Sequence, residues 1–334
     1  MLLSPVLERM PILILSPHNR CNCRCVMCDI WKATGTEEMS AADLRRHVTS
    51  IERLGVEWAV FTGGEPLMHS DLFRLCGILR EREIRVSILS TGLLLERHAA
   101  AIARNVDDVI VSLDGPREIH DRVRRVPEAF QMLQAGIRAI RKLRPEFPIT
   151  GRCTVQRINC THLRATVAAA RELGLNGISF LAADLTSAAF NRPDGWTPER
   201  LAGVAPASEE LPGLELEIEA LVAANECGGF VAESTQKLRR IASHFRGTNA
   251  APQCNAPWVS AVVEANGVVR PCFFHPPVGR IDAENSLLDV VNGQGAVAFR
   301  ATLDVASNPI CRSCVCSLNW KREPVADVEI HHVR

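Results

Sequence analysis

The first half of the chain alternates short apolar runs with longer segments of helical periodicity. The short runs are almost continuously apolar, which is typical of strands covered on both faces of a parallel sheet. Between them, apolar residues recur every three or four positions, as on the buried face of an amphipathic helix. We therefore predict six strands, Ile12–Leu15, Trp58–Thr62, Arg85–Ser90, Asp108–Leu113, Ile149–Gln156 and Gly177–Leu181.

Helix starts can be placed in the segments between these strands. Ser40, with Asp43 three residues later, has the spacing of a capping box and precedes the first apolar stripe. Further stripes begin near Phe130 and Leu163. This order of elements favours a parallel sheet with right-handed crossovers. A complete eight-unit barrel takes about 250 residues, so six units in about 180 residues predict an α/β fold, a partial (β/α)6 TIM-like barrel.

Proline and glycine change the pattern beyond the sixth strand. Residues 183–208 are interrupted by both and predict a linker or lid, and a helical stretch follows over about 209–245. Further on, Asn266-Gly267 separates two apolar runs, which is a strong signal for a β-hairpin. The predicted domains are the barrel at 1–208, connecting helices at 209–249, and a small hairpin-plus-helix domain at 250–334.

Composition and charge narrow the class of protein. Of 334 residues, 47% are hydrophobic and 23% are charged, so the chain can bury a sizeable core. Basic and acidic residues are equal at 38 each, which argues against a nucleic-acid partner. No apolar run approaches the roughly 18 residues of a membrane span. The N-terminus lacks the pattern of a secretory signal. We expect a cytoplasmic protein without a membrane partner.

Thirteen cysteines are unusual for such a protein. In a reducing compartment they are metal ligands, catalytic thiols or inert buried thiols. Cys76, Cys153, Cys160 and Cys227 are scattered and are expected to be buried small hydrophobes. The other nine crowd into two regions and predict two metal sites: Cys21, Cys23, Cys25 and Cys28, then Cys254, Cys272, Cys311, Cys314 and Cys316.

The first region has the spacing C-x3-C-x2-C at Cys21, Cys25 and Cys28. Three thiolates so close in sequence can hold three corners of an iron–sulfur cubane and leave the fourth iron without a protein ligand. An open metal position is where chemistry takes place. A zinc site is the alternative, with Cys23 or His18 as the fourth ligand.

A glycine-rich turn, Gly63–Pro66, directly follows the second predicted strand. In parallel α/β folds, ligands bind at this end of the sheet. Paired glycines let the backbone approach a ligand closely, and the Glu65 carboxylate could hold an ammonium group. Alone, this turn is a weak motif, because glycine and proline occur in many turns. Its position one helix downstream of the three-cysteine loop makes it a strong one.

Together these features resemble the radical S-adenosylmethionine (SAM) enzymes. The resemblance implies a [4Fe–4S] cluster whose open iron chelates SAM, and an external one-electron donor such as flavodoxin or ferredoxin. Reductive cleavage of SAM then yields a 5′-deoxyadenosyl radical that takes a hydrogen atom from substrate. The matching residues are Cys21, Cys25, Cys28, Gly63–Pro66, Val111–Gly115 and Ile119–Arg122.

The same resemblance assigns contacts with SAM. Gly63, Gly64, Glu65 and Pro66 would receive the methionine ammonium group. The family often has an asparagine after the third strand, where this chain has Thr91. Asp114 is placed either at the cofactor or as a brace of its own turn. The remaining implied contacts are Met27 and the Ile30 backbone near adenine, and Thr91 and Ser112 at the ribose.

The C-terminal cysteines resemble the twitch or SPASM extension of this family. Twelve residues separate Cys254 from Gly267, four more precede Cys272, and Cys311-x2-Cys314 follows. The resemblance implies one auxiliary [4Fe–4S] cluster on these four thiolates, with Cys316 as a possible replacement for Cys314. The spacing alone also allows a zinc ribbon with four cysteine ligands.

Three polar residues are candidates for contact with substrate. Arg152 lies on the fifth strand and could bind a carboxylate or phosphate, or instead the SAM carboxylate or an internal acid. Asp184 follows the sixth strand as a proton partner or a helix cap. Arg192 lies in a segment that could close over the site, or in solvent. The histidines at 275, 331 and 332 are expected on surfaces or loops rather than on a metal.

Three functions remain open at this stage. The first is a radical SAM enzyme that acts on a small polar metabolite (a sugar, aminocyclitol or nucleoside) in a dehydrogenation, decarboxylation or epimerisation. Few residues precede the first strand, so no leader-peptide-binding domain is expected there. The second is a SPASM-type maturase of ribosomal peptides. The third is a non-enzymatic iron–sulfur redox sensor or zinc-stabilised binding module, which would need no glycine-rich turn.

Overall fold

The computed structural model describes residues 4–249 and 252–321. Its centre is one sheet of nine strands in the order β6-β5-β4-β3-β2-β1-β7-β8-β9. The first six strands follow one another in sequence and are all parallel. They confirm the six predicted strands to within one or two residues at each end: β1 Ile12–Ser16, β2 Trp58–Phe61, β3 Arg85–Ser90, β4 Asp108–Ser112, β5 Ile149–Val155 and β6 Ile178–Ala182.

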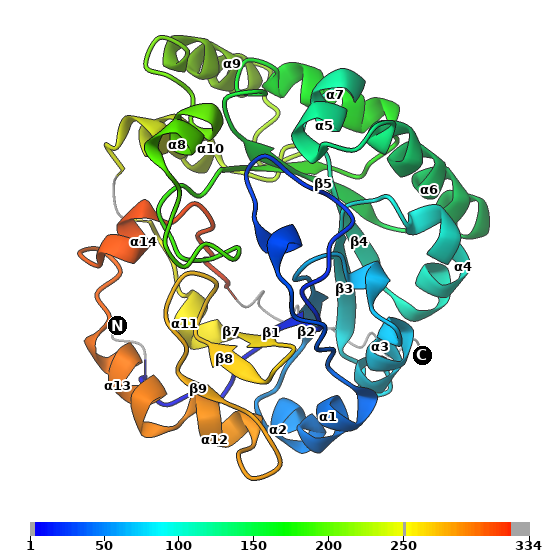
Figure 1. The fold of residues 1–334 in the computed structure, drawn as a ribbon, viewed down its shortest axis with the longest axis vertical. Coiled ribbons are helices and arrows are strands. Elements are labelled where there is room, and N and C mark those ends of the chain that lie inside the picture. Colours follow the sequence, from blue (N-terminus) through cyan, green and yellow to red (C-terminus); the bar gives the residue numbers. More distant parts are fainter. Residues whose placement is uncertain (1–3, 250–251, 322–334) are drawn as a thin grey trace, which may run out of the picture.

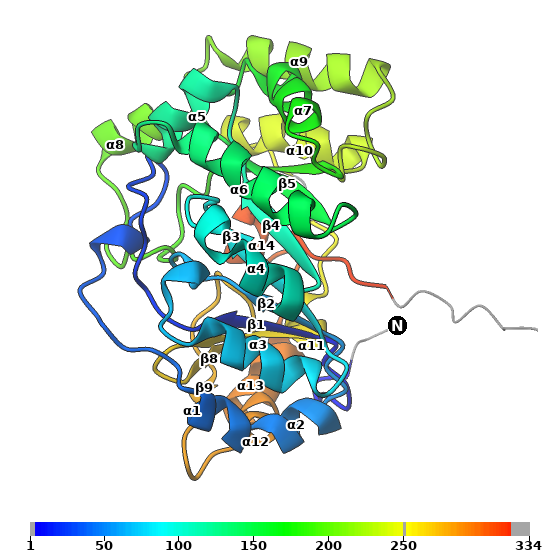
Figure 2. The same ribbon diagram turned by 90° about the vertical axis from the view of Figure 1, so that its right-hand side faces the viewer.

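The sheet curves into a partial barrel with its helices on the outside (Figures 1 and 2). Along β5, buried and half-buried residues alternate strictly, because one row of side chains packs under the helices and the other faces the barrel interior. The outer layer between β1 and β6 comprises α1 Ala41–Arg46, α2 Val48–Arg53, α3 Leu72–Arg80, α4 Leu95–Asn105, α5 Arg117–Arg124, α6 Ala129–Leu143 and α7 Leu163–Glu172.

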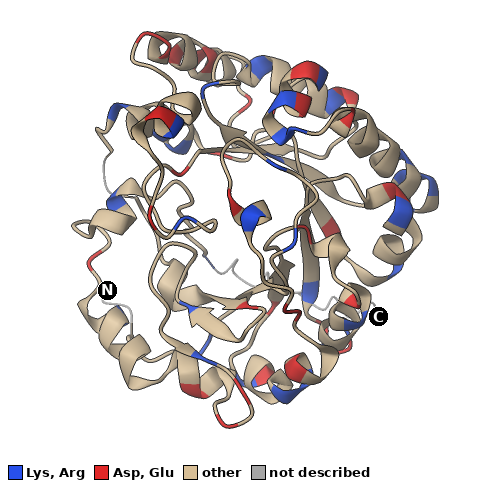
Figure 3. Ribbon diagram, in the orientation of Figure 1, with Lys and Arg blue, Asp and Glu red and all other residues tan. Residues whose placement is uncertain are grey.

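The capping box predicted at the first helix is present. The Ser40 hydroxyl accepts a hydrogen bond from the Asp43 amide at 3.1 Å, and the Asp43 carboxylate accepts one from the Ser40 amide at 2.9 Å. The single apolar stripe after it forms two short helices, α1 and α2, because His47 lies between them in a non-helical conformation. Both charge signs are interspersed over the outer helices (Figure 3).

The segment after β6 is mostly irregular, as predicted, and contains one short helix, α8 Pro198–Val204. The predicted helical stretch is two helices, α9 Leu211–Ala223 and α10 Thr235–Arg246. They are separated by a turn in which Asn225 has a positive φ of 57°. After this turn the chain forms an isolated parallel bridge from Val231 to Ile178 of β6.

The predicted hairpin is formed by β7 Ser260–Glu264 and β8 Val268–Arg270. Gly267 has a φ of +81° in its turn, and an added Cβ would lie 2.4 Å from the Ile281 carbonyl oxygen. A third short strand, β9 Gly279–Arg280, pairs with β8. The helices around this hairpin are α11 Ala256–Val259, α12 Leu287–Val291, α13 Gln294–Thr302 and α14 Pro309–Ser313.

The pairing of β7 was not predicted, because the sequence indicated only a hairpin within a small C-terminal domain. β7 runs parallel to β1, with Ile12 opposite Ser260 and Ser16 opposite Glu264. The hairpin therefore continues the barrel sheet, and no break in the sheet separates residues before 250 from those after it. None of the helices within 4–249 and 252–321 combines the length and apolar character needed to cross a membrane.

Candidate functional site

The cysteine loop, residues 17–39, leaves the carboxyl end of β1 and lies over the middle of the ring of strands (Figure 1). It contains the short 3-10 helix η1, Ile30–Lys32. Cys25 is buried, whereas Cys21 and Cys28 are half-buried. The first candidate metal site therefore lies where parallel barrels bind their ligands.

The glycine-rich turn packs directly against this loop. The Glu65 amide donates to the Arg20 carbonyl at 2.8 Å. A Cβ on Gly64 would lie 1.9 Å from the same carbonyl oxygen, and Gly63 has a φ of +105°. The glycines are thus required for backbone contact with the cysteine loop. The prediction that they serve close approach to a ligand overlooked this nearer partner.

The Glu65 carboxylate is fully buried and already satisfied. It accepts hydrogen bonds from the Leu67 amide at 3.1 Å, the Ser90 hydroxyl at 2.9 Å, and the Thr91 amide and hydroxyl at 2.6 Å each. Burial raises the pKa of Glu65, and these hydrogen bonds oppose that rise. The expectation that this carboxylate holds an ammonium group is therefore corrected: it braces the ends of β2 and β3. The hydroxyl of Thr91, a predicted ribose contact, donates to this same carboxylate.

His18 is not placed to be a fourth zinc ligand. It is buried, its Nε2 lies 2.9 Å from the Glu65 carbonyl oxygen, and its Nδ1 accepts from the Arg20 amide at 3.0 Å. Both ring nitrogens are thus engaged: Nε2 joins the cysteine loop to the glycine-rich turn, and Nδ1 joins two residues within the loop. This removes one of the two zinc alternatives at the N-terminal site.

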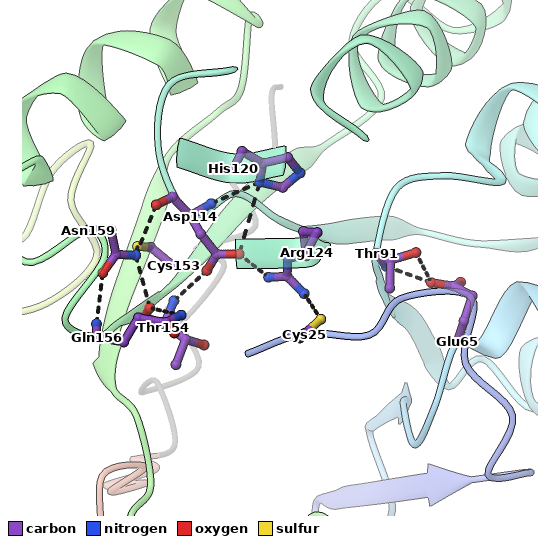
Figure 4. A network of polar contacts seen from close by, with 10 residues as sticks. All are labelled: Cys25, Glu65, Thr91, Asp114, His120, Arg124, Cys153, Thr154, Gln156 and Asn159. Atoms are coloured by element: carbon purple, nitrogen blue, oxygen red, sulfur yellow. Dashed lines mark hydrogen bonds and ion pairs between the residues drawn. The ribbon is translucent and has the colours of Figure 1, made fainter. Parts of the chain in front are cut away.

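The other side of the cysteine loop is attached to α5. The Arg24 amide donates to the Arg124 carbonyl at 3.2 Å, and the Val26 amide donates to the Val123 carbonyl at 3.1 Å. The Arg124 guanidinium also reaches the Cys25 sulfur at 3.5 Å (Figure 4). The loop is therefore held by backbone hydrogen bonds on two sides.

Asp114 braces this contact. Its side chain is fully buried and forms an ion pair with Arg124 at 2.5 Å. It also accepts from the Thr154 amide at 3.0 Å, while its own amide donates to His120 at 3.2 Å (Figure 4). Of the two roles predicted for Asp114, the geometry matches the brace.

The thiols of the loop differ in their surroundings. Burial raises the pKa of Cys21 to about 12 and that of Cys28 to about 11. The pKa of Cys25 is lowered, first by a hydrogen bond from the Cys23 thiol and also by the Arg124 guanidinium. The thiolate is the form that binds metal, so Cys25 is the thiol best prepared for it. Met27 and Ile30 are half-buried beside this set, and the Ile30 amide lies 3.5 Å from the Cys28 sulfur.

The donor chemistry of the loop fits an iron–sulfur cluster. Within the described residues, no three His, Cys, Asp or Glu side chains converge as the ligands of a single ion would. A cubane does not need such convergence, because each thiolate binds a different iron. The loop contains four thiols at one end of the barrel, of which Cys21, Cys25 and Cys28 have the cluster spacing, and its nearest histidine is engaged elsewhere.

The C-terminal cysteines come together from separate segments. The charge of Cys254 raises the pKa of Cys272, Cys311 and Cys314, which places all four in one neighbourhood, although burial is the larger cause. Cys316 is exposed, and its amide donates to the Cys314 sulfur at 3.3 Å. The charge of Cys316 also raises the pKa of Cys272 and Cys314, so Cys316 lies in the same neighbourhood, and the choice between Cys314 and Cys316 as the fourth thiolate stays a prediction.

His275 lies in a loop, as the prediction of a surface or loop position allowed, but it is buried. Its contact with a cysteine was not predicted: its Nε2 lies 3.2 Å from the Cys311 sulfur. Its ring packs edge-on against Phe299 at 4.8 Å between centroids. The available signal was its position three residues after Cys272. The histidines at 331 and 332 lie outside the described residues.

Two of the predicted SAM and substrate residues share the inner face of the barrel. Ser112 at the end of β4 is in register with Arg152 on β5, and both are half-buried. The Arg152 Nε donates to the Ser179 hydroxyl on β6 at 3.3 Å. The charge of Arg152 also acts on the buried Glu233 carboxylate, as the alternative of an internal acid requires, and its contact with substrate stays a prediction.

Asp184 and Arg192 form an internal ion pair, which corrects both predicted roles for Asp184 and the solvent alternative for Arg192. The Arg192 side chain is 1% exposed and also donates to the Asp184 carbonyl at 2.7 Å. The Asp184 carboxylate additionally accepts from the Ser187 hydroxyl. It caps no helix and, with these partners, is not a free proton carrier.

The predicted lid touches both cysteine regions. The buried Asp29 of the cysteine loop accepts from the Trp196 indole and from Arg200, both at 2.6 Å. Phe190 packs against Phe274 of the C-terminal region at 6.2 Å between centroids. Sequence patterns gave no sign of these contacts, because neither Asp29 nor Trp196 belongs to a recognisable motif.

Comparison with known proteins agrees with this arrangement. The sequence model of the radical SAM superfamily matches residues 15–178, and that of SPASM, an iron–sulfur cluster-binding domain, matches residues 254–315. The chain is 30% identical over 162 residues to an AdoMet-dependent heme synthase of Methanosarcina barkeri, which is 46% of this chain and 45% of the relative. It is 37% identical over 102 residues to a probable GTP 3′,8-cyclase of Methanopyrus kandleri, which is 30% of this chain and 33% of the relative. The matches thus span less than half of these curated relatives.

Solved structures share the fold over most of the chain. Streptococcus suis SuiB bound to S-adenosylmethionine superposes with a TM-score of 0.66 and 14% identity, over 94% of this chain and 74% of that one. Native anSMEcpe with bound AdoMet superposes with a TM-score of 0.62 and 19% identity, over 86% of this chain and 82% of that one. The predicted cofactors, SAM with a [4Fe–4S] cluster and an auxiliary iron–sulfur cluster, agree with both family matches, and the zinc ribbon is not supported. The chain belongs to the radical SAM superfamily and carries a SPASM iron–sulfur cluster-binding domain.

Proposed function

We propose that the protein cleaves SAM reductively at a [4Fe–4S] cluster held by Cys21, Cys25 and Cys28. The radical formed would react with a small polar substrate inside the barrel. When bound, the cluster and SAM supply a 5′-deoxyadenosyl radical for hydrogen abstraction. The protein itself holds the cofactor in place, orients the substrate and excludes water. An external one-electron donor such as flavodoxin or ferredoxin completes the system.

One observation carries this proposal: the cysteine loop and the glycine-rich turn form a single unit. The turn is hydrogen-bonded to residues 18–20, which lead directly into Cys21. In the described residues, no hydrogen bond reaches the carbonyl oxygens of Gly63 and Gly64. We assign these two oxygens to the ammonium group of SAM, in place of the Glu65 carboxylate.

The side chain of Arg152 favours a substrate that carries an anionic group. Its Nε is used by Ser179, and within the described residues its two outer nitrogens have no hydrogen-bond partner. A guanidinium fork recognises carboxylate or phosphate in two-point contacts. The substrates that fit are small and polar, such as an acidic sugar, aminocyclitol or nucleoside. An auxiliary cluster held by the C-terminal cysteines would allow dehydrogenation by taking up an electron, or decarboxylation or epimerisation by supplying one.

A peptide substrate is the second candidate. The structures of SuiB bound to the precursor peptide SuiA and of anSMEcpe with a bound peptide share the fold over 93% and 86% of this chain. This chain would then be a maturase of the SPASM type. The two candidates differ in the source of the hydrogen atom that 5′-deoxyadenosine receives.

The proposal is tested with anaerobically reconstituted protein, a low-potential reductant and SAM. Formation of 5′-deoxyadenosine is expected, and Cys25→Ala should abolish it while Cys76→Ala, a buried thiol of α3, should not. Deuterium transfer into 5′-deoxyadenosine from labelled acidic metabolites supports the first candidate, and transfer from a labelled peptide supports the second. Cluster-loaded protein that yields no 5′-deoxyadenosine under any of these conditions contradicts the proposal.

A further inference from the structure

We propose that Arg124 is a positioning residue that directs a permanent positive charge at the Cys25 ligand and makes the SAM-binding cluster easier to reduce. The inference rests on the proposed role of Cys25 as a cluster ligand. It concerns a side chain that neither the cysteine motif nor the glycine-rich turn contains.

The geometry places the guanidinium between a thiol and an acid. Arg124 is the last residue of α5 and is 6% exposed. One of its outer nitrogens lies 3.5 Å from the Cys25 sulfur, and the other lies 2.5 Å from the Asp114 carboxylate (Figure 4). The guanidinium is planar and rigid, so fixing one nitrogen at Asp114 aims the other at the sulfur.

The parts on either side of Arg124 are themselves fixed. Asp114 is held by the Thr154 amide at 3.0 Å, and the Asn159 side chain donates to the Asp114 carbonyl at 2.9 Å. The cysteine loop is attached to the end of α5 by backbone hydrogen bonds from Arg24 and Val26. The distance from guanidinium to sulfur is therefore set by the fold on both sides, and not by a flexible side chain alone.

The three cysteines of the loop differ in their contact with Arg124. The Cys25 sulfur accepts a hydrogen bond from the Arg124 guanidinium at 3.5 Å. The Cys21 sulfur accepts from the Cys23 amide and the Cys28 sulfur from the Ile30 amide, and the charges of Arg124 and Arg192 act on Cys28 without a hydrogen bond in the described residues. Arginine stays protonated at any working pH. Reduction adds negative charge to the cluster, and a buried cation on one of its thiolates stabilises that charge with little screening from water. Hydrogen bonds to the sulfurs are among the factors that set cluster potentials.

The experiment uses the reconstituted two-cluster protein and follows the cluster whose EPR spectrum changes on addition of SAM. Its midpoint potential is compared in wild type, Arg124→Gln, Arg124→Lys and Arg122→Gln. Arg122 is on the same helix but exposed, so it is the matched control. We expect Arg124→Gln to keep its iron and show a lower potential, Arg124→Lys to recover part of the shift, and Arg122→Gln to match wild type.

Removing Arg124 leaves Asp114 as an unpaired buried charge, which can prevent folding. The double variant Arg124→Gln/Asp114→Asn removes both charges and should also show a lower potential. An iron-loaded single or double variant with the wild-type potential overturns the inference. If Arg124→Gln keeps the wild-type potential but Cys25→Ala loses the SAM-sensitive cluster, the role of Arg124 is refuted and the proposed function is not. A Cys25→Ala protein that retains the cluster refutes the ligand assignment itself.

Discussion

The two cysteine regions of this chain are built in opposite ways. Cys21, Cys25 and Cys28 belong to one loop that is fastened by backbone hydrogen bonds to the turn at Gly64 and Glu65 and to the end of α5. The C-terminal cysteines come from the segment before α11, the segment after β8, and α14 with the residues after it. The first site is prepared by the barrel, whereas the second exists only when distant segments close on one another.

The closing contact of the second region depends largely on one asparagine. The Asn255 amide donates to the Leu318 carbonyl at 2.8 Å, and its side chain exchanges hydrogen bonds with the Trp320 backbone at 2.7 and 2.9 Å. A site of this kind gains more of its order from the bound metal, because ligand binding and folding are coupled there. Thiol ligands are therefore preorganised by the fold in the cysteine loop, whereas the C-terminal cysteines are brought together from separate segments.

The largest expected effect is the loss of one cluster or the other when a cysteine of either region is replaced. Wild-type protein should hold about eight irons per chain, as two [4Fe–4S] clusters require. Cys28→Ala and Cys272→Ala should each lose about half of that iron. Only Cys28→Ala should abolish 5′-deoxyadenosine formation, because SAM is cleaved at the first cluster. Iron counting and product analysis check both variants, and the comparison breaks if Cys272→Ala stops SAM cleavage completely.

The next effect tests whether the first site is held by its brace. Glu65→Ala leaves the Ser90 hydroxyl and the Leu67 and Thr91 amides without their shared acceptor. We expect a loss of about 3 kcal/mol or more in the free energy of unfolding, since each unsatisfied buried donor costs about 1–3 kcal/mol. Urea denaturation of the apo protein measures it. Thr91→Val is the smaller control, with an expected loss of about 1 kcal/mol.

A pH effect is expected beside the first site. Burial lowers the pKa of His120 from its ordinary value of 6.5 to about 3, so the unfolded chain binds a proton that the folded protein does not. Stability is then highest above pH 6.5 and is lost as the pH falls toward 3. From pH 7 to pH 5 the loss should be about 2 kcal/mol. Denaturation at both pH values should show a smaller dependence for His120→Gln, and an equal dependence refutes the assignment.

The smallest effect belongs to the second region. Asn255→Ala removes two side-chain hydrogen bonds to the Trp320 backbone, and we expect a loss of about 1 kcal/mol because these groups are partly exposed. Limited proteolysis should cut apo Asn255→Ala faster than wild type, and reconstitution of the auxiliary cluster should reduce the difference. Equal cleavage with and without the cluster would show that metal adds no order there. Asn319→Ala, an exposed neighbour, is the control.

Local patterns predicted much of this fold. The six barrel strands, the capping box at Ser40 and the hairpin at Gly267 each depend on residues close in sequence, so periodicity and turn chemistry reveal them. The cysteine motif and the glycine-rich turn were recognisable for the same reason. The parallel pairing of β1 with β7 was not, because nothing in either strand identifies a partner at the far end of the chain.

The site residues divide in the same way. Arg152 lies half-buried on β5, as the alternation along that strand requires, and its contact with substrate stays a prediction. Arg124 and His275 were missed as partners of cysteines, because their significance lies in contacts made across the fold. Glu65 was assigned to the wrong partner because Ser90 and Thr91 satisfy its carboxylate, and they follow it by more than twenty residues.

The pairing of β7 with β1 also affects how the protein is made. While the chain emerges from the ribosome, β1 can pair with β2 early, but its other edge waits until residues 260–264 have been synthesised. An open strand edge invites pairing with other chains. The segment between Cys254 and Cys272 therefore closes an edge of β1 that would otherwise stay open to other chains.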